Sequence, residues 1–182
     1  MDRLLELLRT HSFARRNVVL ASGKASDFFI DCKQTVLLAE GHALVAEAML
    51  GALAAPSFGR VDAVAGVELG GCPLASAVSL LSFQRGNAKD AIYVRKEAKD
   101  HGSKRLVEGD GHLPRGSRIA LLEDVVTTGG STLRAADKLR AAGHEIAGVV
   151  AIVDRSEGGR EAIESAGIPI VTLYRRVDFI PA

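Results

Sequence analysis

The chain of 182 residues has the length of one domain with a sizeable hydrophobic core. Hydrophobic residues make up 47% of it and charged residues 25%, which is typical of a globular protein in water. The formal net charge of +1 and the lack of a long apolar run give no reason to expect nucleic-acid or membrane binding. Cys32 and Cys72 form neither a metal-type cluster nor a disulfide framework, so we expect a reducing, cytoplasmic location.

The N-terminal segment combines a helical pattern with a hairpin pattern. Four leucines between positions 4 and 8 predict a short amphipathic helix over residues 1–10. Residues 17–33 are typical of two short strands about a Ser-Gly turn. In an extended strand Phe28 and Phe29 point to opposite faces, so one can pack inward while the other lines a pocket. A core hairpin with a solvated Lys24 is the simpler interpretation of this segment.

A helix and a buried strand are predicted next. Residues 39–55 follow helical spacing, with Leu44, Ala48 and Leu53 as core candidates. Residues 62–67 form a short apolar run, which indicates a buried strand.

The strand leads into a glycine turn, Glu68-Leu69-Gly70-Gly71, that opens a second helix. Pro73 suits the first turn of that helix. Backbone amides near Gly70 and Gly71 could contact an anion. A tight connection that needs small residues explains the turn equally well.

A charged connection over residues 95–109 follows the next predicted strand, residues 91–94. Between positions 95 and 105 there are five Lys or Arg residues against two acids. A connection of this kind is usually a solvated surface loop. Alternatively, it is a cationic lid that closes over a bound polyanion, excludes water and neutralises a leaving group.

Residues 119–132 combine a strand, an acidic pair and a turn of small residues that opens a helix. The run 119–122 is typical of a strand buried on both faces of a parallel sheet, and Glu123 and Asp124 close it. The turn presents backbone amides at a helix N-terminus, a position suited to phosphate, and its two glycines allow close approach. The hydroxyls there belong to Thr127, Thr128, Ser131 and Thr132.

The two carboxylates of this segment need a different role, because they would repel a phosphate. Acceptor-only groups suit the paired hydroxyls of a sugar, or a cation. A phosphorylated ribose therefore fits the acidic pair and the turn together. An ordinary strand-to-helix turn with a capping Thr or Ser is the alternative.

The C-terminal part continues the alternation of helices and strands. The helix after the small-residue turn ends at Gly143, and residues 146–153 indicate another strand. A short helix and a last strand are predicted over residues 160–167 and 169–173. This alternation predicts a doubly wound α/β fold with a mainly parallel sheet flanked by helices. We expect a single domain over residues 1–182, with an N-terminal hood at about 1–35 and a core at about 36–182.

Asp154 and Arg155 follow the strand 146–153, at an edge of the sheet where ligands bind in open α/β folds. The planar, permanently charged guanidinium of Arg155 suits a carboxylate ligand. An ion pair with Glu157 or a surface role is the alternative.

Motifs spread from Ser22 to Gly159 resemble, in order, those of the type I phosphoribosyltransferases, and among them the orotate phosphoribosyltransferases. Residues 119–132 are similar to the motif that binds phosphoribosyl pyrophosphate (PRPP), and residues 66–75 to the loop that binds its pyrophosphate. Leu-x-Ser-Gly-x-x-Ser, with an aromatic pair and an Asp after it, resembles the N-terminal signature of the orotate enzymes. Arg-Lys-x-x-Lys-x-His-Gly resembles their catalytic loop, and Asp-Arg-x-Glu-Gly-Gly completes the pattern.

This resemblance implies an activity: transfer of the 5-phosphoribosyl group from PRPP to orotate, giving orotidine 5′-monophosphate and pyrophosphate in de novo pyrimidine (UMP) biosynthesis. It implies Mg²⁺ as a cofactor, bound mainly through PRPP. It also implies a homodimer in which the loop 95–109 contributes to the site of the neighbouring subunit.

The resemblance further implies roles for individual residues. The catalytic groups would be Arg95, Lys96, Lys99, His101 and Asp124. PRPP contacts would fall on Lys24, on the four loop residues just named, and on Glu123, Asp124, Val125, Val126, Thr127, Thr128, Gly129, Gly130 and Ser131. The pyrophosphate loop would be Glu68, Leu69, Gly70 and Gly71. Orotate contacts would fall on Lys24, Phe28, Phe29, Thr127 and Arg155.

Two other functions stay open. A purine-type phosphoribosyltransferase would account for the PRPP motif, but not for the N-terminal signature or Arg155. A non-catalytic PRPP-sensing regulator would predict a degraded cationic loop, whereas the loop here is intact. The acidic pair is Glu-Asp where many members of the wider superfamily have Asp-Asp, a change that moves one carboxylate but retains its acceptors.

Overall fold

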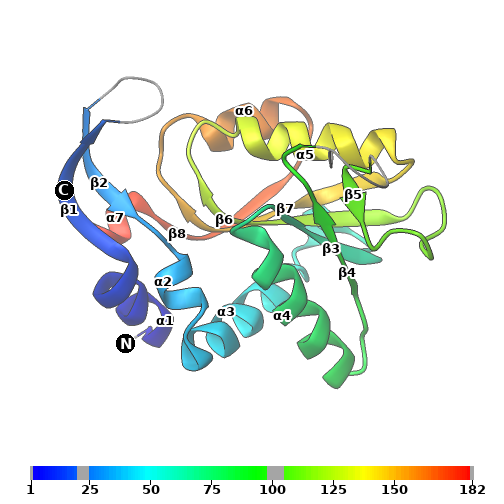
Figure 1. The fold of residues 1–182 in the computed structure, drawn as a ribbon, viewed down its shortest axis with the longest axis horizontal. Helices are drawn as coiled ribbons and strands as arrows, with labels where there is room; N and C mark the ends of the chain where they lie inside the picture. The colour runs from blue at the N-terminus through cyan, green and yellow to red at the C-terminus, as the bar shows by residue number, and fades with distance from the viewer. Residues whose placement is uncertain (1, 20–24, 98–104, 181–182) are drawn as a thin grey trace.

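The computed structural model describes residues 2–19, 25–97 and 105–180. A six-stranded sheet forms its centre, in the order β5-β4-β3-β6-β7-β8 (Figure 1). All neighbouring strands are parallel except β4 and β5, which are antiparallel. The strands are β3 (Ala63–Val67), β4 (Asp90–Val94), β5 (Val107–Glu108), β6 (Arg118–Val126), β7 (Glu145–Asp154) and β8 (Ile170–Arg175).

Helices cover both faces of this sheet. The helices α3 (Ala39–Ala52) and α4 (Gly71–Gln84) pack on one face, and α5 (Gly130–Ala141) and α6 (Gly159–Ser165) pack on the other (Figure 1). The central strands are therefore buried on both faces, which explains why their sequences are apolar throughout rather than alternating. The predicted doubly wound α/β fold is confirmed.

The N-terminal hood is a separate two-stranded antiparallel sheet beside the main one. It consists of α1 (Arg3–Leu7), a π-helical turn (Leu8–Ser12), β1 (Phe13–Val19), β2 (Ala25–Ile30) and α2 (Lys33–Val36). The predicted helix and hairpin are present, although the first strand begins at Phe13, earlier than expected. The side chains of Leu4, Leu8 and Phe28 belong to the same hydrophobic cluster as α3 and α4.

The C-terminal tail holds the hood in place, a role that its sequence did not indicate. The short helix α7 (Arg176–Phe179) puts the ring of Phe179 5.6 Å from the rings of both Phe13 and Phe28. Arg176 forms an ion pair with Asp27 of β2. Residues from the two ends of the chain thus make one aromatic cluster, and a local pattern cannot predict such a contact.

Two other details differ from the expectations. In α3 the fully buried side chains are Val45 and Met49, whereas Leu44 and Ala48 are only partly buried. Two residues of the expected 95–109 loop, Val107 and Glu108, pair with β4 as β5. A two-residue strand is too short for any hydrophobic periodicity.

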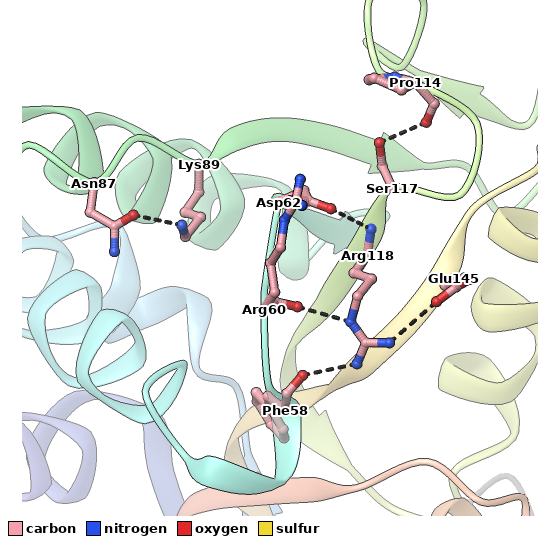
Figure 2. Close-up of polar contacts among 9 residues, drawn as sticks. All are labelled: Phe58, Arg60, Asp62, Asn87, Lys89, Pro114, Ser117, Arg118 and Glu145. Carbon is pink, nitrogen blue, oxygen red and sulfur yellow. Dashed lines mark hydrogen bonds and ion pairs between the residues drawn. The ribbon is translucent and has the colours of Figure 1, made fainter.

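Arg118 joins the amino ends of the central strands (Figure 2). Its guanidinium donates hydrogen bonds to the carbonyl oxygens of Arg60 and Phe58, each at 3.0 Å, and pairs with Glu145 at 3.2 Å. Its backbone N–H donates to the carboxylate of Asp62 at 2.9 Å. These contacts lie at the edge of the sheet opposite the carboxyl ends of its strands, so they serve the fold.

Within the described part of the chain, no helix is long and apolar enough to cross a membrane.

Gly148 provides a test of the core packing. A Cβ at this position of β7 would lie 2.9 Å from Cζ of Phe58 and closer still to two other ring atoms, and that ring is completely buried. We expect Gly148→Ala to lower the free energy of unfolding by about 1–3 kcal/mol in urea denaturation. Gly51→Ala is the control, because nothing lies within 4 Å of its Cβ position in α3, and there we expect no loss. Equal losses in both variants would contradict this account.

Candidate active site

The carboxyl ends of β3, β4, β6 and β7 meet at one edge of the sheet. The direction of strand order reverses between β3 and β6, since β4 lies on one side of β3 and β7 on the far side of β6. A crevice outside the strand ends is expected at such a point. The glycine turn after β3 and the small-residue turn after β6 flank it, so the two predicted anion-binding segments are neighbours.

The two carboxylates of the acidic pair lie at the end of β6 in different surroundings, because neighbouring residues of a strand point to opposite faces. Glu123 is 4% exposed, and its Oε1 accepts hydrogen bonds from the hydroxyls of Thr132 at 2.9 Å and Ser131 at 3.4 Å. Asp124 is partly buried and accepts a hydrogen bond from the backbone N–H of Val125 at 2.9 Å.

The expectation that Thr132 presents its hydroxyl to a phosphate is wrong in this structure. Thr132 is 1% exposed and donates to Glu123. Its position in the first turn of α5 faces the sheet, where the buried carboxylate requires hydrogen-bond donors. Thr128 and Ser131, by contrast, are exposed at the start of the helix.

Burial dominates the titration of both acids. It raises the pKa of Glu123 to about 7; the Asp124 charge adds to this effect, and the two hydroxyls and the Lys96 charge oppose it. Burial also raises the pKa of Asp124, against the Val125 amide and the charge of Lys33. Glu123 therefore holds a proton to a higher pH than an exposed glutamate does.

The turn between β6 and α5 has the backbone geometry expected of an anion cradle. Gly129 is the N-cap of α5 with φ +78°, in the left-handed region that glycine adopts without strain. Gly159 lies at the start of α6, after the turn that follows β7. A Cβ there would lie 2.9 Å from the backbone nitrogen of Gly129, so the turn after β7 is in close contact with the turn after β6. Val126 is 1% exposed, which leaves only its backbone for a contact with a ligand.

The glycine turn after β3 touches the acidic pair. A Cβ on Gly70 would lie 2.8 Å from Oδ1 of Asp124 and closer to its other carboxylate atoms, so this approach requires glycine. Gly71 packs in the same way on the backbone of Leu122. Leu69 is 67% exposed. The carboxylate of Glu68 faces the next strand instead, where it accepts a hydrogen bond from the backbone N–H of Lys96, just after β4.

The described part of the cationic loop begins at the end of β4. The guanidinium of Arg95 lies 3.8 Å from Glu108 of β5. Lys96 is exposed, and its backbone N–H donates to Glu68 at 2.9 Å. Lys99, His101 and Lys24 lie outside the described residues, so their roles stay predictions.

Arg155 joins the sheet edge to the hood. Its guanidinium pairs with Glu157 at 2.9 Å, donates to the carbonyl oxygen of Phe28 at 3.0 Å and lies over the Phe28 ring. Phe28 has no exposed surface, whereas Phe29 is partly exposed. Of the two aromatic residues, Phe28 is thus the one that packs inward, and its side chain does not reach the crevice. Thr127 is partly exposed.

Comparison with known proteins agrees with this geometry. A family model described as phosphoribosyl transferase domain matches residues 37–166. An orotate phosphoribosyltransferase of Sorangium cellulosum is 64% identical over 99% of this chain and 93% of its own length. The chain belongs to the orotate phosphoribosyltransferase family.

Other members of this family support the assignment. The orotate phosphoribosyltransferase of Rhodopseudomonas palustris is 42% identical over 98% of this chain and 95% of its own length. The orotate phosphoribosyltransferase of Mycobacterium tuberculosis in complex with PRPP superposes with a TM-score of 0.78 at 31% identity, covering 98% of this chain and 97% of that one.

The structure places further residues beside these segments that sequence reasoning missed. Lys33 of α2 is close enough to Asp124 to influence its pKa, and Cys32 contacts the Asp124 carbonyl. Arg134 and Lys138 of α5 line a cavity of about 250 Å³ together with Lys96. The spacing of Ser131, Arg134 and Lys138 is the one available signal, since these positions share one face of a helix.

The residues present fit a divalent cation only in part. Glu123 and Asp124 offer two carboxylates, one of them largely enclosed. Within the described ranges, no group of three or more His, Cys, Asp or Glu side chains could hold a metal ion. Mg²⁺ at this edge would therefore take most of its oxygen ligands from a bound substrate.

Glu123 should make stability depend on pH. An acid with a higher pKa in the folded than in the unfolded state binds more protons when folded, so stability falls as pH rises. The shift from 4.5 to about 7 predicts a loss of about 3 kcal/mol, which accumulates between pH 4.5 and pH 7 and then levels off. In Glu123→Gln, urea unfolding at pH 5 and pH 8 should lack this component. Glu161→Gln, on the exposed side of α6, should retain it; an unchanged pH dependence in Glu123→Gln would contradict the assignment.

Proposed function

We propose that this chain transfers the 5-phosphoribosyl group of PRPP to orotate, giving orotidine 5′-monophosphate and pyrophosphate in de novo pyrimidine biosynthesis. The observation that carries the proposal is the contact between Gly70 and Asp124 at the switch point. This contact brings the glycine turn against the acidic pair, which lies just before the N-terminus of α5. The helix N-terminus suits the 5′-phosphate of PRPP, the acidic pair its ribose, and the glycine turn its pyrophosphate. The relatives named orotate phosphoribosyltransferase support orotate as the acceptor.

PRPP would lie across this crevice with one group on each segment. The backbone from Val125 to Ser131 would hold the 5′-phosphate at the N-terminus of α5. Glu123 and Asp124 would accept hydrogen bonds from the ribose hydroxyls, and residues 68–71 would contact the pyrophosphate. A carboxylate pair fixed beside the ribose favours the cationic, oxocarbenium-like sugar that forms as the pyrophosphate leaves.

Charge that accumulates on the departing pyrophosphate needs cations. Arg95 and Lys96, with Lys99 and His101, would supply them from the loop after β4. Mg²⁺ bound with the substrate would neutralise part of the same charge.

Orotate would bind beside the hood. Arg155 offers a guanidinium suited to its carboxylate, already oriented by Glu157 and by the carbonyl of Phe28. Thr127, Phe29 and Lys24 would complete this side of the site, and Phe28 would act by supporting Arg155 from the core.

The active form would be a homodimer that shares the loop 95–109 between subunits. Exposed apolar residues of the glycine turn and of α4 support this assembly: Leu69 is 67% exposed, Leu80 62% and Phe83 74%. An apolar surface of this kind favours a protein partner. The free thiols of Cys32 and Cys72 support the expected cytoplasmic location.

The proposed reaction can be measured as the loss of orotate absorbance in the presence of PRPP and Mg²⁺. Adenine, hypoxanthine and uracil are run as alternative acceptors. We expect orotate alone to be consumed, because it carries the carboxylate that Arg155 would bind. Turnover of a purine would favour a purine-type enzyme, and tight PRPP binding without turnover of any base would favour a PRPP-sensing regulator.

Gly70→Ala tests the contact that carries the proposal. The new methyl group displaces the end of a flexible Asp124 side chain, so the fold should tolerate it while the carboxylate leaves its position. We expect PRPP affinity in calorimetry to fall about 10-fold or more, the cost of losing one charge-assisted hydrogen bond. Gly111→Ala is the control, since nothing lies within 4 Å of its Cβ position. Unchanged PRPP affinity in Gly70→Ala would refute the placement of the ribose.

A further inference from the structure

Lys138 is a partly buried lysine of α5 whose ammonium group makes two contacts with backbone. Its Nζ donates hydrogen bonds to the carbonyl oxygen of Arg95 at 2.7 Å and to that of Lys96 at 2.8 Å. These carbonyls belong to the two residues directly after β4. Lys138 itself lies on α5, seven residues after Ser131, and so on the same face of the helix that begins at the proposed phosphate cradle.

Two successive carbonyls that point to one ammonium group show that the backbone is not extended at Arg95 and Lys96. In an extended strand successive carbonyls point in opposite directions. The chain instead bends at Lys96, and a lysine, with three donors on one nitrogen, can satisfy both carbonyls at the bend. The other polar groups of the bend are also paired: the N–H of Arg95 donates to Leu106 and that of Lys96 to Glu68.

The bend places its residues between two parts of the site. Glu68, which accepts from the Lys96 amide, belongs to the proposed pyrophosphate loop. On the other side, the charge of Lys96 reaches Glu123 of the acidic pair, and Lys96, Ser131 and Lys138 line one cavity of about 250 Å³. A change in the bend would therefore move two cationic side chains relative to both segments.

We propose that Lys138 is a positioning residue for the phosphoribosyl transfer, which holds the Arg95–Lys96 bend so that these cations face the leaving group. This inference rests on the proposed function. Lys138 would not touch substrate, because its ammonium is engaged by backbone carbonyls.

The test compares three variants by steady-state kinetics. Lys138→Met retains the aliphatic stem and removes the donors, and Lys138→Arg restores donors and charge. Arg140→Met is the matched control, since it removes one charge from the same helix, where the exposed Arg140 pairs with Asp137. We expect Lys138→Met to lower kcat/KM for PRPP about 10-fold or more, because the bend loses both of its bonds to the ammonium group, with the KM for orotate within about 2-fold. Lys138→Arg should recover most of the loss, and Arg140→Met should show little.

Two further measurements separate positioning from a general effect of charge. At 1 M salt, where charges more than about 3 Å apart are screened, the deficit of Lys138→Met should persist; its disappearance would overturn the proposal, as would an equal deficit in Arg140→Met. Amide hydrogen exchange at Lys96 should be faster in Lys138→Met than in Arg140→Met, and equal rates would also overturn it. Exchange needs no turnover, so it tests the hold of Lys138 on the bend even if the wild-type enzyme is inactive, a result that would refute the proposed function.

Discussion

The close approach of two backbone turns at the switch point of the sheet is the constraint on which the site depends. Gly70 lies against the Asp124 carboxylate, and Gly71 against the backbone of Leu122, at distances that no Cβ allows. The parallel pairing of β3 with β6 brings these turns to the same edge. The glycines then let them touch, so one ligand can reach both.

Burial separates the two signs of charge around this crevice. The acidic pair is enclosed at the end of a central strand, and its hydroxyl and amide donors come from the next helix and from its own backbone. Arg95 and Lys96 form a bend just after β4. Glu68, in the turn before α4, and Lys138 of α5 hold this bend by hydrogen bonds to its backbone. A hydrogen-bond donor or a cation that reaches the enclosed Glu123 stabilises its charged form. The exposed Lys96, by contrast, can adjust to a polyanion.

Sequence patterns predicted the strands and turns that meet at this edge of the sheet, but not which way each side chain points. The run 119–124, the glycine turn at 68–71 and Arg155 are local signals, because each couples a strand end to a turn of distinctive residues. The alternation of Phe28 and Phe29 predicted that one points inward, but not which one. Thr132 was misassigned because a hydroxyl in a first helical turn can face either a ligand or the sheet, and only the buried Glu123 decides between them.

The sequence by itself determined the α/β architecture, the order of the motifs, and which strands are followed by turns of glycine, hydroxyl and charged residues. These follow from hydrophobic periodicity and turn residues, which act over a few neighbours along the chain. The tertiary structure alone decided how Lys138 meets the Arg95–Lys96 bend, how Phe179 closes the hood over Phe28, and how burial raises the pKa of Glu123. Each depends on residues far apart in sequence, whose contact exists only once the sheet has set their separation.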